Sequence, residues 1–296
     1  MIQVTNLRKS FGPLVAVDGV SFEVRPGETF GLLGPNGAGK STTINMLCGA
    51  LRPDSGRVAI DGAADPTRPE VRHRIGLAPQ ALSLYDGLSG EENLYFFGRL
   101  YGLRGARLKE RVDWALTFAG LTERRRDRTG IYSGGMKRRL NLACALVHDP
   151  PVIFLDEPTA GVDPQSCNHI FENIEGLARQ GRTVLYTTHY MEEAQRLCHR
   201  VAIMDHGKIL ALDTVAGLIA QHGGRAVVEA RLAGPVPEGV ALPGALDGDR
   251  LRIDTDQPLE ELVRLAAAGV KVAAIRTEEP DLEAVFLALT GRRLRD

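Results

Sequence analysis

Hydrophobic and polar positions along the chain follow two periods, one typical of buried strands and the other of helices. Continuous apolar runs at 29–33 and 152–155 predict strands of a buried sheet. Ile44, Leu47 and Leu51 recur at helical spacing soon after the first run and predict a helix there. Strand and helix alternate along most of the chain, which is the order expected of an α/β fold with a largely parallel sheet.

This alternation ends at residues 222–224, where two adjacent glycines interrupt the pattern. Residues 225–296 then predict strand, strand, helix, strand and helix, an order typical of a small α+β accessory domain. Between about residues 81 and 148 the larger part is mostly helical and rich in arginine. The predicted organisation is an α/β domain over 1–220, which contains this helical subdomain, followed by the accessory domain.

A glycine-rich segment separates the first buried strand from the helix that follows it. Gly34, Gly39, Lys40 and Ser41 fit the pattern G-x-x-x-x-G-K-[ST], in which backbone N–H groups surround the α- and β-phosphates. The lysine reaches the β- and γ-phosphates, the serine hydroxyl binds Mg²⁺, and the helix N-terminus adds a partial positive charge. A turn without a ligand is the alternative, but the flanking strand and helix favour a triphosphate site. The residues assigned to nucleotide binding are Gly34, Pro35, Asn36, Gly37, Ala38, Gly39, Lys40, Ser41 and Thr42.

Two adjacent acids, Asp156 and Glu157, close the buried strand at 152–155. Asp156 is expected to hold Mg²⁺, directly or through its waters, and Glu157 to polarise the attacking water. In isolation, such a pair would more often be a helix cap and a solvated neighbour. A phosphate loop in the same chain favours the catalytic interpretation.

Four further short motifs accompany these two in a consistent order, namely Gln80, Ser133-Gly134-Gly135-Met136, Gly161-Val162-Asp163 and His189. Over about residues 1–220 the chain resembles an ATP-binding cassette (ABC) ATPase, whose Q-loop, signature loop, D-loop and switch histidine these residues match. No single motif would identify the family, but their joint order does. The resemblance implies a P-loop NTPase fold with a helical signature subdomain.

The resemblance also implies a role for the signature loop and the D-loop. Ser133, Gly134 and Gly135 would cap the γ-phosphate of an ATP bound to the other subunit, and Asp163 would lie at the same nucleotide interface. Two ATP molecules would therefore lie between two protomers. The sequence itself adds that a hydroxyl and backbone N–H donors at a helix start suit a second anion site.

The remaining motif residues are expected to act on the bound nucleotide. By resemblance, Gln80 would meet Mg²⁺ or water and couple the site to a transmembrane partner, while His189 would hold the γ-phosphate and orient Glu157. Phe11 would stack on adenine, at a position where the family more often has Tyr. The signature departs from the family at Tyr132, where Leu is usual, which bears on loop packing but not on the phosphate contacts.

One signature-like sequence does not fit the family order. Leu88-Ser89-Gly90 lies too near Gln80 and runs into two acids, which would repel a phosphate. We therefore do not assign it to nucleotide binding.

Composition narrows the classes of protein further. The 296 residues carry a formal net charge of −1, which argues against a surface devoted to nucleic acid. The arginines between 104 and 128, and those at the start of the predicted helix 136–146, are expected to form a solvated face. The four cysteines form no C-x-x-C pair and are expected to be free thiols in a reducing cytoplasm. We expect neither a signal peptide nor a membrane span, because no apolar stretch reaches the roughly 18–20 residues that a span needs.

The sequences of three segments, 163–166, 186–194 and 282–287, resemble those of cassettes of bacterial drug exporters of the daunorubicin-resistance kind. The resemblance implies an ATPase at the cytoplasmic side of the inner membrane, bound to a separate transmembrane permease. The segment Gln80–Tyr101 would form most of the docking surface, with contacts from the apolar run 94–97. Two alternatives stay open, namely a non-transport ABC switch on ribosomes or DNA, and an importer ATPase. The transported substrate is not encoded in this chain.

Overall fold

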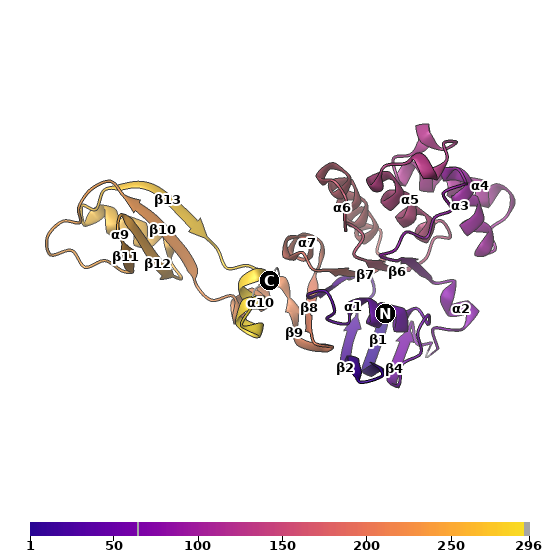
Figure 1. The fold of residues 1–296 in the computed structure, drawn as a ribbon, viewed down its shortest axis with the longest axis horizontal. Coiled ribbons are helices and arrows are strands. Elements are labelled where there is room, and N and C mark those ends of the chain that lie inside the picture. The colour runs from indigo at the N-terminus through magenta and orange to yellow at the C-terminus, as the bar shows by residue number, and fades with distance from the viewer. Residues whose placement is uncertain (64, 293–296) are drawn as a thin grey trace. The chain divides into compact units, whose positions relative to one another are not determined.

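The computed structural model describes residues 1–63 and 65–292, and the chain divides into two compact units, Met1–Val215 and Ala216–Asp296. Figure 1 traces both units in chain order, with the elements labelled. Within the described residues, no helix is both long and apolar enough to cross a membrane. All four cysteines are free thiols, as their spacing predicts.

A six-stranded sheet forms the centre of the first unit, in the order β5-β6-β7-β3-β8-β9. All neighbouring strands run parallel except β8 and β9, which pair antiparallel. The side chains of β3, β6 and β7 are buried along their whole length, which explains their continuous apolar sequences. The strands are β3 (Thr29–Leu33), β5 (Ile75–Ala78), β6 (Val152–Asp156), β7 (Thr183–Thr188), β8 (Arg200–Asp205) and β9 (Lys208–Thr214).

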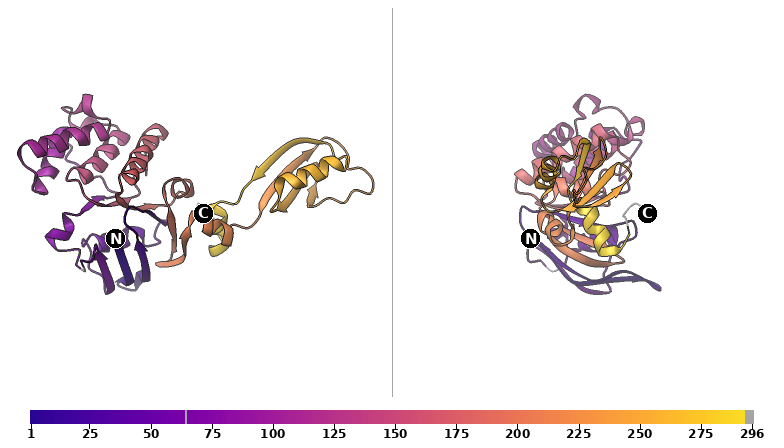
Figure 2. Two further views of the ribbon diagram at one scale, coloured as in Figure 1. Left: turned by 180° about the vertical axis from the view of Figure 1, so that it is seen from behind. Right: turned by 90° about the vertical axis from the view of Figure 1, so that its left-hand side faces the viewer.

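An antiparallel sheet of three strands, ordered β2-β1-β4, lies on one side of the central sheet, together with helix α1 (Figures 1 and 2). One hydrophobic core joins this sheet, α1 and the lower face of the central sheet, and it includes Ile2, Phe22, Phe30, Ile44 and Phe154. The rings of Phe22 and Phe30 stack at 5.2 Å. The elements are β1 (Ile2–Phe11), β2 (Leu14–Val24), β4 (Ser55–Ile60) and α1 (Lys40–Leu47).

Helices cover the other side of the central sheet (Figure 2). A second core holds α3, α4 and α5 together and includes Leu94, Leu116 and Leu140. Helix α3 begins with a capping box in which Ser89 and Glu92 each bond the other's backbone N–H. Ser89 is therefore the N-cap of α3. The elements of this layer are α3 (Gly90–Leu100), α4 (Gly105–Phe118), the 3₁₀ turns η1 (Thr122–Arg124) and η2 (Thr129–Ile131), α5 (Gly134–Leu146), α6 (Pro164–Arg179) and α7 (Met191–Leu197). The short helix α2 (Pro69–Arg72) is not part of it, because its Val71 packs in the first core.

Two expectations for the helical part are wrong in detail, namely the solvated face for Arg111 and Arg138 and the docking contact for Leu94. Arg111 and Arg138 are buried rather than solvated, and both donate to backbone carbonyls. Leu94 is fully buried in the helical core, so it cannot contact a docking partner. Tyr132 is also buried, and its hydroxyl donates to the Arg124 carbonyl at 2.7 Å. That bond accounts for a tyrosine at this position, because the ring fills the core while its polar end is satisfied.

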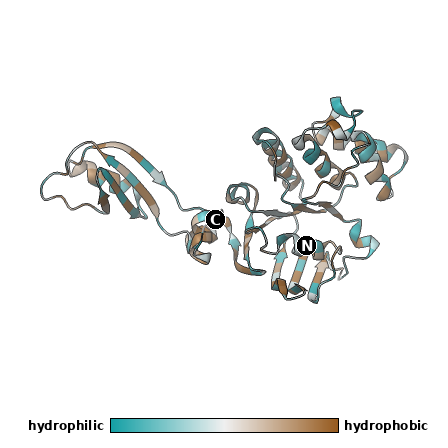
Figure 3. Cartoon of the chain, viewed as in Figure 1, coloured by the Kyte–Doolittle hydropathy of each residue, from teal (hydrophilic) through white to brown (hydrophobic). Residues whose placement is uncertain are grey.

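The second unit contains an antiparallel sheet in the order β11-β12-β10-β13. Hydrophobic and polar residues alternate along β10 and β12 (Figure 3), and Leu265 of α9 packs with Val228 and Ile253 on the apolar face. Strands β9 and β11 and helix α8 were not predicted from the sequence. The elements are α8 (Val215–His222), β10 (Ala226–Leu232), β11 (Ala245–Asp247), β12 (Arg250–Thr255), α9 (Pro258–Ala267), β13 (Val272–Glu278) and α10 (Leu282–Thr290).

Candidate nucleotide-binding site

The glycine-rich loop connects the end of β3 to the start of α1. Gly39 precedes the helix with φ +102°, and a Cβ at this position would lie 2.3 Å from the Ala16 carbonyl oxygen. Only glycine fits such a backbone without movement of the neighbouring strand. Asn36 and Gly37 are exposed at the loop tip, Pro35, Ser41 and Thr42 are half-buried, and Ala38 is buried. The loop thus presents backbone at the N-terminus of a helix, where N–H groups bind anions.

Lys40 points back into this loop. Its ammonium donates to the carbonyls of Gly34 at 2.7 Å and Pro35 at 3.0 Å, and it pairs with Glu157 Oε1 at 3.1 Å. Lys40 and Glu157 are 4% and 6% exposed, so this ion pair is shielded from water. A positive charge is therefore held beside the loop at the position where phosphate oxygens would arrive.

Ser41 and Asp156 supply oxygen atoms next to the loop. The Ser41 hydroxyl donates to Asp156 Oδ1 at 3.1 Å, and the Thr187 hydroxyl donates to the same oxygen at 2.6 Å. A hydroxyl and a carboxylate in contact are the donor set that Mg²⁺ prefers. These residues fit a magnesium ion shared with a nucleotide. Thr187 was not predicted, and it orients the carboxylate from the neighbouring strand.

Glu157 directly follows β6 and adopts a left-handed backbone with φ +46°. Such a conformation is strained for a residue with a side chain and occurs preferentially at functional sites. Two bonds to its N–H hold it there, one to the Thr187 carbonyl at 3.2 Å and one to the Thr187 hydroxyl at 3.0 Å. Gln80 Nε2 donates to Glu157 Oε2 at 3.0 Å, so Gln80 lies beside Glu157.

His189 follows β7 and approaches the other side of Glu157. Its Nδ1 lies 3.3 Å from Glu157 Oε1, which is close enough for an ion pair when the imidazole is protonated. The two groups are not aligned as a hydrogen bond, and Nδ1 has no hydrogen-bond partner among the described residues. The structure thus gathers Lys40, Gln80 and His189 around the carboxylate of Glu157.

The signature residues lie outside this cluster, at the start of α5. The Ser133 hydroxyl caps the helix by accepting from the Met136 N–H at 3.2 Å, and Gly134 is exposed. Gly135 is buried where α5 meets the start of α6, and a Cβ on it would lie 2.2 Å from Ser166 Oγ. This helix start is the kind of second anion site that the sequence predicts.

Asp163 is the N-cap of α6, and the bond that it accepts from the Ser166 N–H at 2.9 Å lowers its pKa. Phe11 lies at the end of β1 and is 49% exposed, with the Lys9 ammonium 5.8 Å from the ring centroid. An exposed ring at this edge suits stacking with a base. Neither residue belongs to the Lys40–Glu157 cluster.

Two buried groups near the site were missed by sequence reasoning. Arg138 of α5 donates to the Gln80 carbonyl at 2.6 Å and to the Ala160 carbonyl at 3.2 Å. Glu193 of α7 accepts from three hydroxyls close to Glu157 and His189. Neither carries a motif of its own, and only the tertiary fold reveals their partners.

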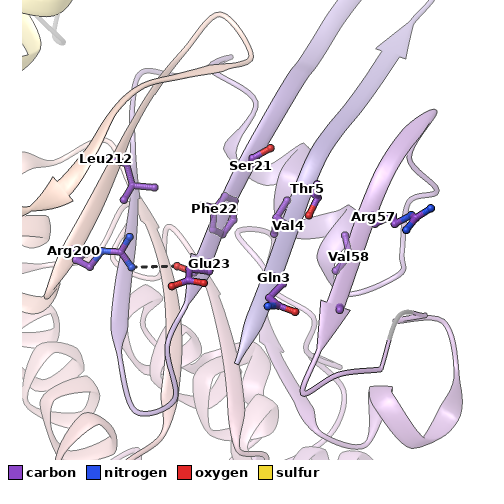
Figure 4. Close-up of a pocket in the computed structure, with 11 residues that line it drawn as sticks. Gln3, Val4, Thr5, Ser21, Phe22, Glu23, Arg57, Val58, Arg200 and Leu212 are labelled. Atoms are coloured by element: carbon purple, nitrogen blue, oxygen red, sulfur yellow. Dashed lines mark hydrogen bonds between the residues drawn. The ribbon is translucent and has the colours of Figure 1, made fainter.

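A separate hollow of about 590 Å³ lies on the outer face of the antiparallel sheet (Figure 4). Gln3, Thr5 and Arg57 line it, and Arg200 closes one side by donating to the Glu23 carbonyl at 3.3 Å. None of the residues assigned to the nucleotide lines this hollow. The loop between β3 and α1 therefore remains the candidate site.

Comparison with known proteins agrees with this geometry. Residues 17–160 match the family model described as ABC transporter. The linearmycin resistance ATP-binding protein LnrL of Bacillus subtilis (strain 168) is 40% identical over 312 residues, which span 100% of both chains. A Nod factor export ATP-binding protein I of Cupriavidus metallidurans is 42% identical over 300 residues, 100% of this chain and 99% of that protein.

Solved structures give the same result for the fold. An ATP-binding subunit of an ABC transporter aligns with a TM-score of 0.69 and 30% identity, over 75% of this chain and 93% of that one. A dimeric ATP-binding cassette in a post-hydrolysis state, bound to ADP and Pi, aligns with a TM-score of 0.67 and 26% identity. That alignment covers 72% of this chain and 98% of the cassette.

Proposed function

Since the chain belongs to the ATP-binding proteins of ABC transporters, we propose that it powers an exporter by hydrolysing ATP for a separate transmembrane permease. The family is an ATPase family, and one solved relative holds the products ADP and Pi. The export role is supported by relatives named for linearmycin resistance and Nod factor export, which match this chain along its whole length. We propose drugs or other hydrophobic compounds as the class of substrate that the permease exports. We also propose that this chain lies at the cytoplasmic side of the membrane.

The observation that carries the ATPase proposal is the buried cluster around Glu157. Lys40 and the loop backbone bind the phosphates, and Ser41 and Asp156 hold Mg²⁺, which neutralises phosphate charge. Glu157 accepts the proton of the attacking water, since its carboxylate is held between Gln80 and His189. Phosphoryl transfer needs positioning and charge neutralisation more than covalent chemistry, and this cluster supplies both.

ABC cassettes dimerise and work with transmembrane partners, and we propose a homodimer for this chain. Each ATP is held between Gly34–Thr42 of one protomer and Ser133–Gly135 of the other. The exposed start of α5 supports this arrangement, because its N–H donors are available to a phosphate from outside the protomer. ATP binding closes the dimer and moves the permease, and hydrolysis reopens it.

The surface of α3 supports a hydrophobic docking partner. A hollow of about 540 Å³ lies beside Tyr95, Phe96 and Leu100, of which Phe96 is 40% and Leu100 66% exposed. Tyr85, half-exposed, packs edge-on against Phe96 at 4.9 Å. Exposed aromatic and aliphatic groups gathered on one helix are typical of a protein interface.

The test is purification of the tagged protein from membranes in mild detergent. We expect a multi-span protein to accompany it and to stimulate its Mg²⁺-dependent ATPase activity. Phe96→Asp should abolish this recovery, whereas Leu210→Asp, at an exposed apolar residue of β9, should not. Recovery of ribosomal or DNA-associated proteins alone would contradict the exporter role and favour a non-transport ABC switch, and a solute-binding protein would favour an importer.

A further inference from the structure

Glu193 lies in the first turn of α7, buried to 8% exposure, and the partners that the structure gives it are hydroxyls. Thr159 donates to Oε1 at 2.6 Å, while Tyr186 and Thr188 donate to Oε2 at 2.8 and 2.5 Å. A buried carboxylate usually pairs with a cation, because an isolated buried charge is costly. Here three short bonds offset that cost, so each hydroxyl is held firmly in place.

The three hydroxyls belong to segments that carry the proposed catalytic groups. Thr159 lies two residues after Glu157, in a turn closed by a bond from the Ala160 N–H to the Glu157 carbonyl at 3.2 Å. Thr188 directly precedes His189, and its hydroxyl accepts from the Tyr190 N–H at 2.9 Å. One carboxylate therefore binds both the turn after Glu157 and the turn that presents His189.

Thr188 also reaches the phosphate loop. Its carbonyl accepts from the Gly34 N–H at 3.3 Å, at the point where β3 ends and the loop begins. Thr188 thus links α7 to the loop, because its hydroxyl bonds Glu193 and its carbonyl bonds Gly34. A shift of the Glu193 carboxylate would move His189 relative to both Glu157 and the loop.

From this arrangement we propose that Glu193 is a positioning residue for ATP hydrolysis, which fixes His189 against Glu157 through the hydroxyls of Thr188 and Thr159. It does not touch the nucleotide. The inference rests on the proposed function of Glu157 and His189. Its specific content is that the contribution of Glu193 to turnover passes through His189.

The kinetic test is a double-mutant cycle between Glu193→Ala and His189→Ala, with Glu192→Ala, an exposed neighbour on α7, as the control. Glu193→Ala should lower kcat on the order of 10-fold or more and change the KM for ATP far less. In the His189→Ala background it should have no further effect on kcat. Multiplicative losses, or a KM change equal to the kcat change, would overturn the proposal.

A conservative variant separates positioning from folding. Glu193→Gln keeps the shape and can still accept from Thr188 and Tyr186, so it should retain more activity than Glu193→Ala. Melting temperatures and nucleotide binding of both variants show whether they fold. Equal activity of the two variants, with both folded, would contradict a role in orienting the hydroxyls.

Hydrogen exchange provides a readout that does not depend on ATPase activity. In Glu193→Ala, the amides of 157–162 and 188–190 should exchange faster together, including that of Tyr190, whose acceptor is the Thr188 hydroxyl. Faster exchange confined to α7 would overturn the inference even if the protein hydrolysed no ATP. Absence of wild-type turnover, by contrast, would refute the proposed function and leave the exchange result to decide on Glu193.

Discussion

Lys40 Nζ and Glu157 Oε1 form a buried ion pair of 3.1 Å, which joins the proposed phosphate-binding lysine to the proposed base. Each of these charges is therefore neutralised by the other in the structure described here. A γ-phosphate would compete with Glu157 for the Lys40 ammonium, so nucleotide binding is expected to lengthen the distance between Lys40 and Glu157. The free carboxylate then becomes available to water only when the nucleotide has taken over the lysine.

The first prediction concerns the charge of Glu157. Glu157→Gln should bind ATP but lower kcat by about 100-fold or more, because an amide cannot accept the proton. It should accumulate as an ATP-bound dimer, which light scattering with Mg²⁺ and ATP measures. Turnover at the wild-type rate in this variant would remove Glu157 from the role of base.

The second prediction concerns His148, whose ring stacks on Tyr101 at 3.6 Å and whose Nε2 bonds the Ile75 carbonyl at 3.0 Å. Burial lowers its pKa from 6.5 to about 4, and Nδ1 has no hydrogen-bond partner among the described residues. The pKa of His148 is lower in the folded state than in the unfolded state. Its contribution to the stability of the folded state is therefore complete above about pH 6.5 and is lost as pH falls toward 4.

When pH falls from 7.5 to 5, protonation of this histidine should lower the free energy of unfolding by about 2 kcal/mol. His148→Phe keeps the stacking and removes the titration, so its stability should fall less over the same interval. Urea unfolding at both pH values measures the difference between the two proteins. Parallel losses in wild type and variant would show that His148 does not titrate in this range.

The third prediction compares two glycines of the phosphate loop. Both have positive φ, but a Cβ on Gly37 meets nothing within 4 Å, whereas on Gly39 it would lie 2.3 Å from a backbone oxygen. Gly37→Ala should cost about 1–2 kcal/mol from its dihedral angle alone. Gly39→Ala should cost clearly more, since β2 must move. Denaturant titration compares them, and equal losses would contradict the packing around Gly39.

The fourth prediction compares two glycines of the signature loop. Gly134 is exposed with its nearest neighbour at 4.0 Å, so Gly134→Ala should leave the isolated chain as stable as wild type. Gly135→Ala should cost roughly 1–3 kcal/mol, because Ser166 and α6 must shift. If ATP of the partner subunit lies against α5, Gly134→Ala should still weaken ATP-driven dimerisation. Normal dimerisation of that variant would argue against close approach of the phosphate there.

Strong local patterns were sufficient to predict the parts of the fold that surround the site. Continuous apolar runs predicted β3 and β6, because both strands are buried on two faces and neither alternates. Strand β9 was missed since it lies at the sheet edge and is only half-buried. Helix α8 was missed because its apolar residues occupy most positions and show little periodicity.

For the site, sequence order indicated which residues carry chemistry but not which groups hold them. Lys40, Asp156 and Glu157 have motifs, and the structure brings all three together. Thr187, Arg138 and Glu193 have none, because each contacts at least one group that is distant in the sequence and is brought close only by the fold. In the sequence, Arg138 looks like a solvated charge at the start of α5, and only the fold shows that backbone carbonyls surround it.

The close approach of Gly135 to Ser166 has a mechanical consequence. Because the first turn of α5 lies directly on the first turn of α6, neither can slide without displacing the other. Arg138 also connects α5 to the backbone carbonyls of Gln80 and Ala160 through hydrogen bonds. A push on the helical layer from a membrane protein would therefore be transmitted as one rigid-body displacement to the signature loop, the D-loop and the Q-loop at once.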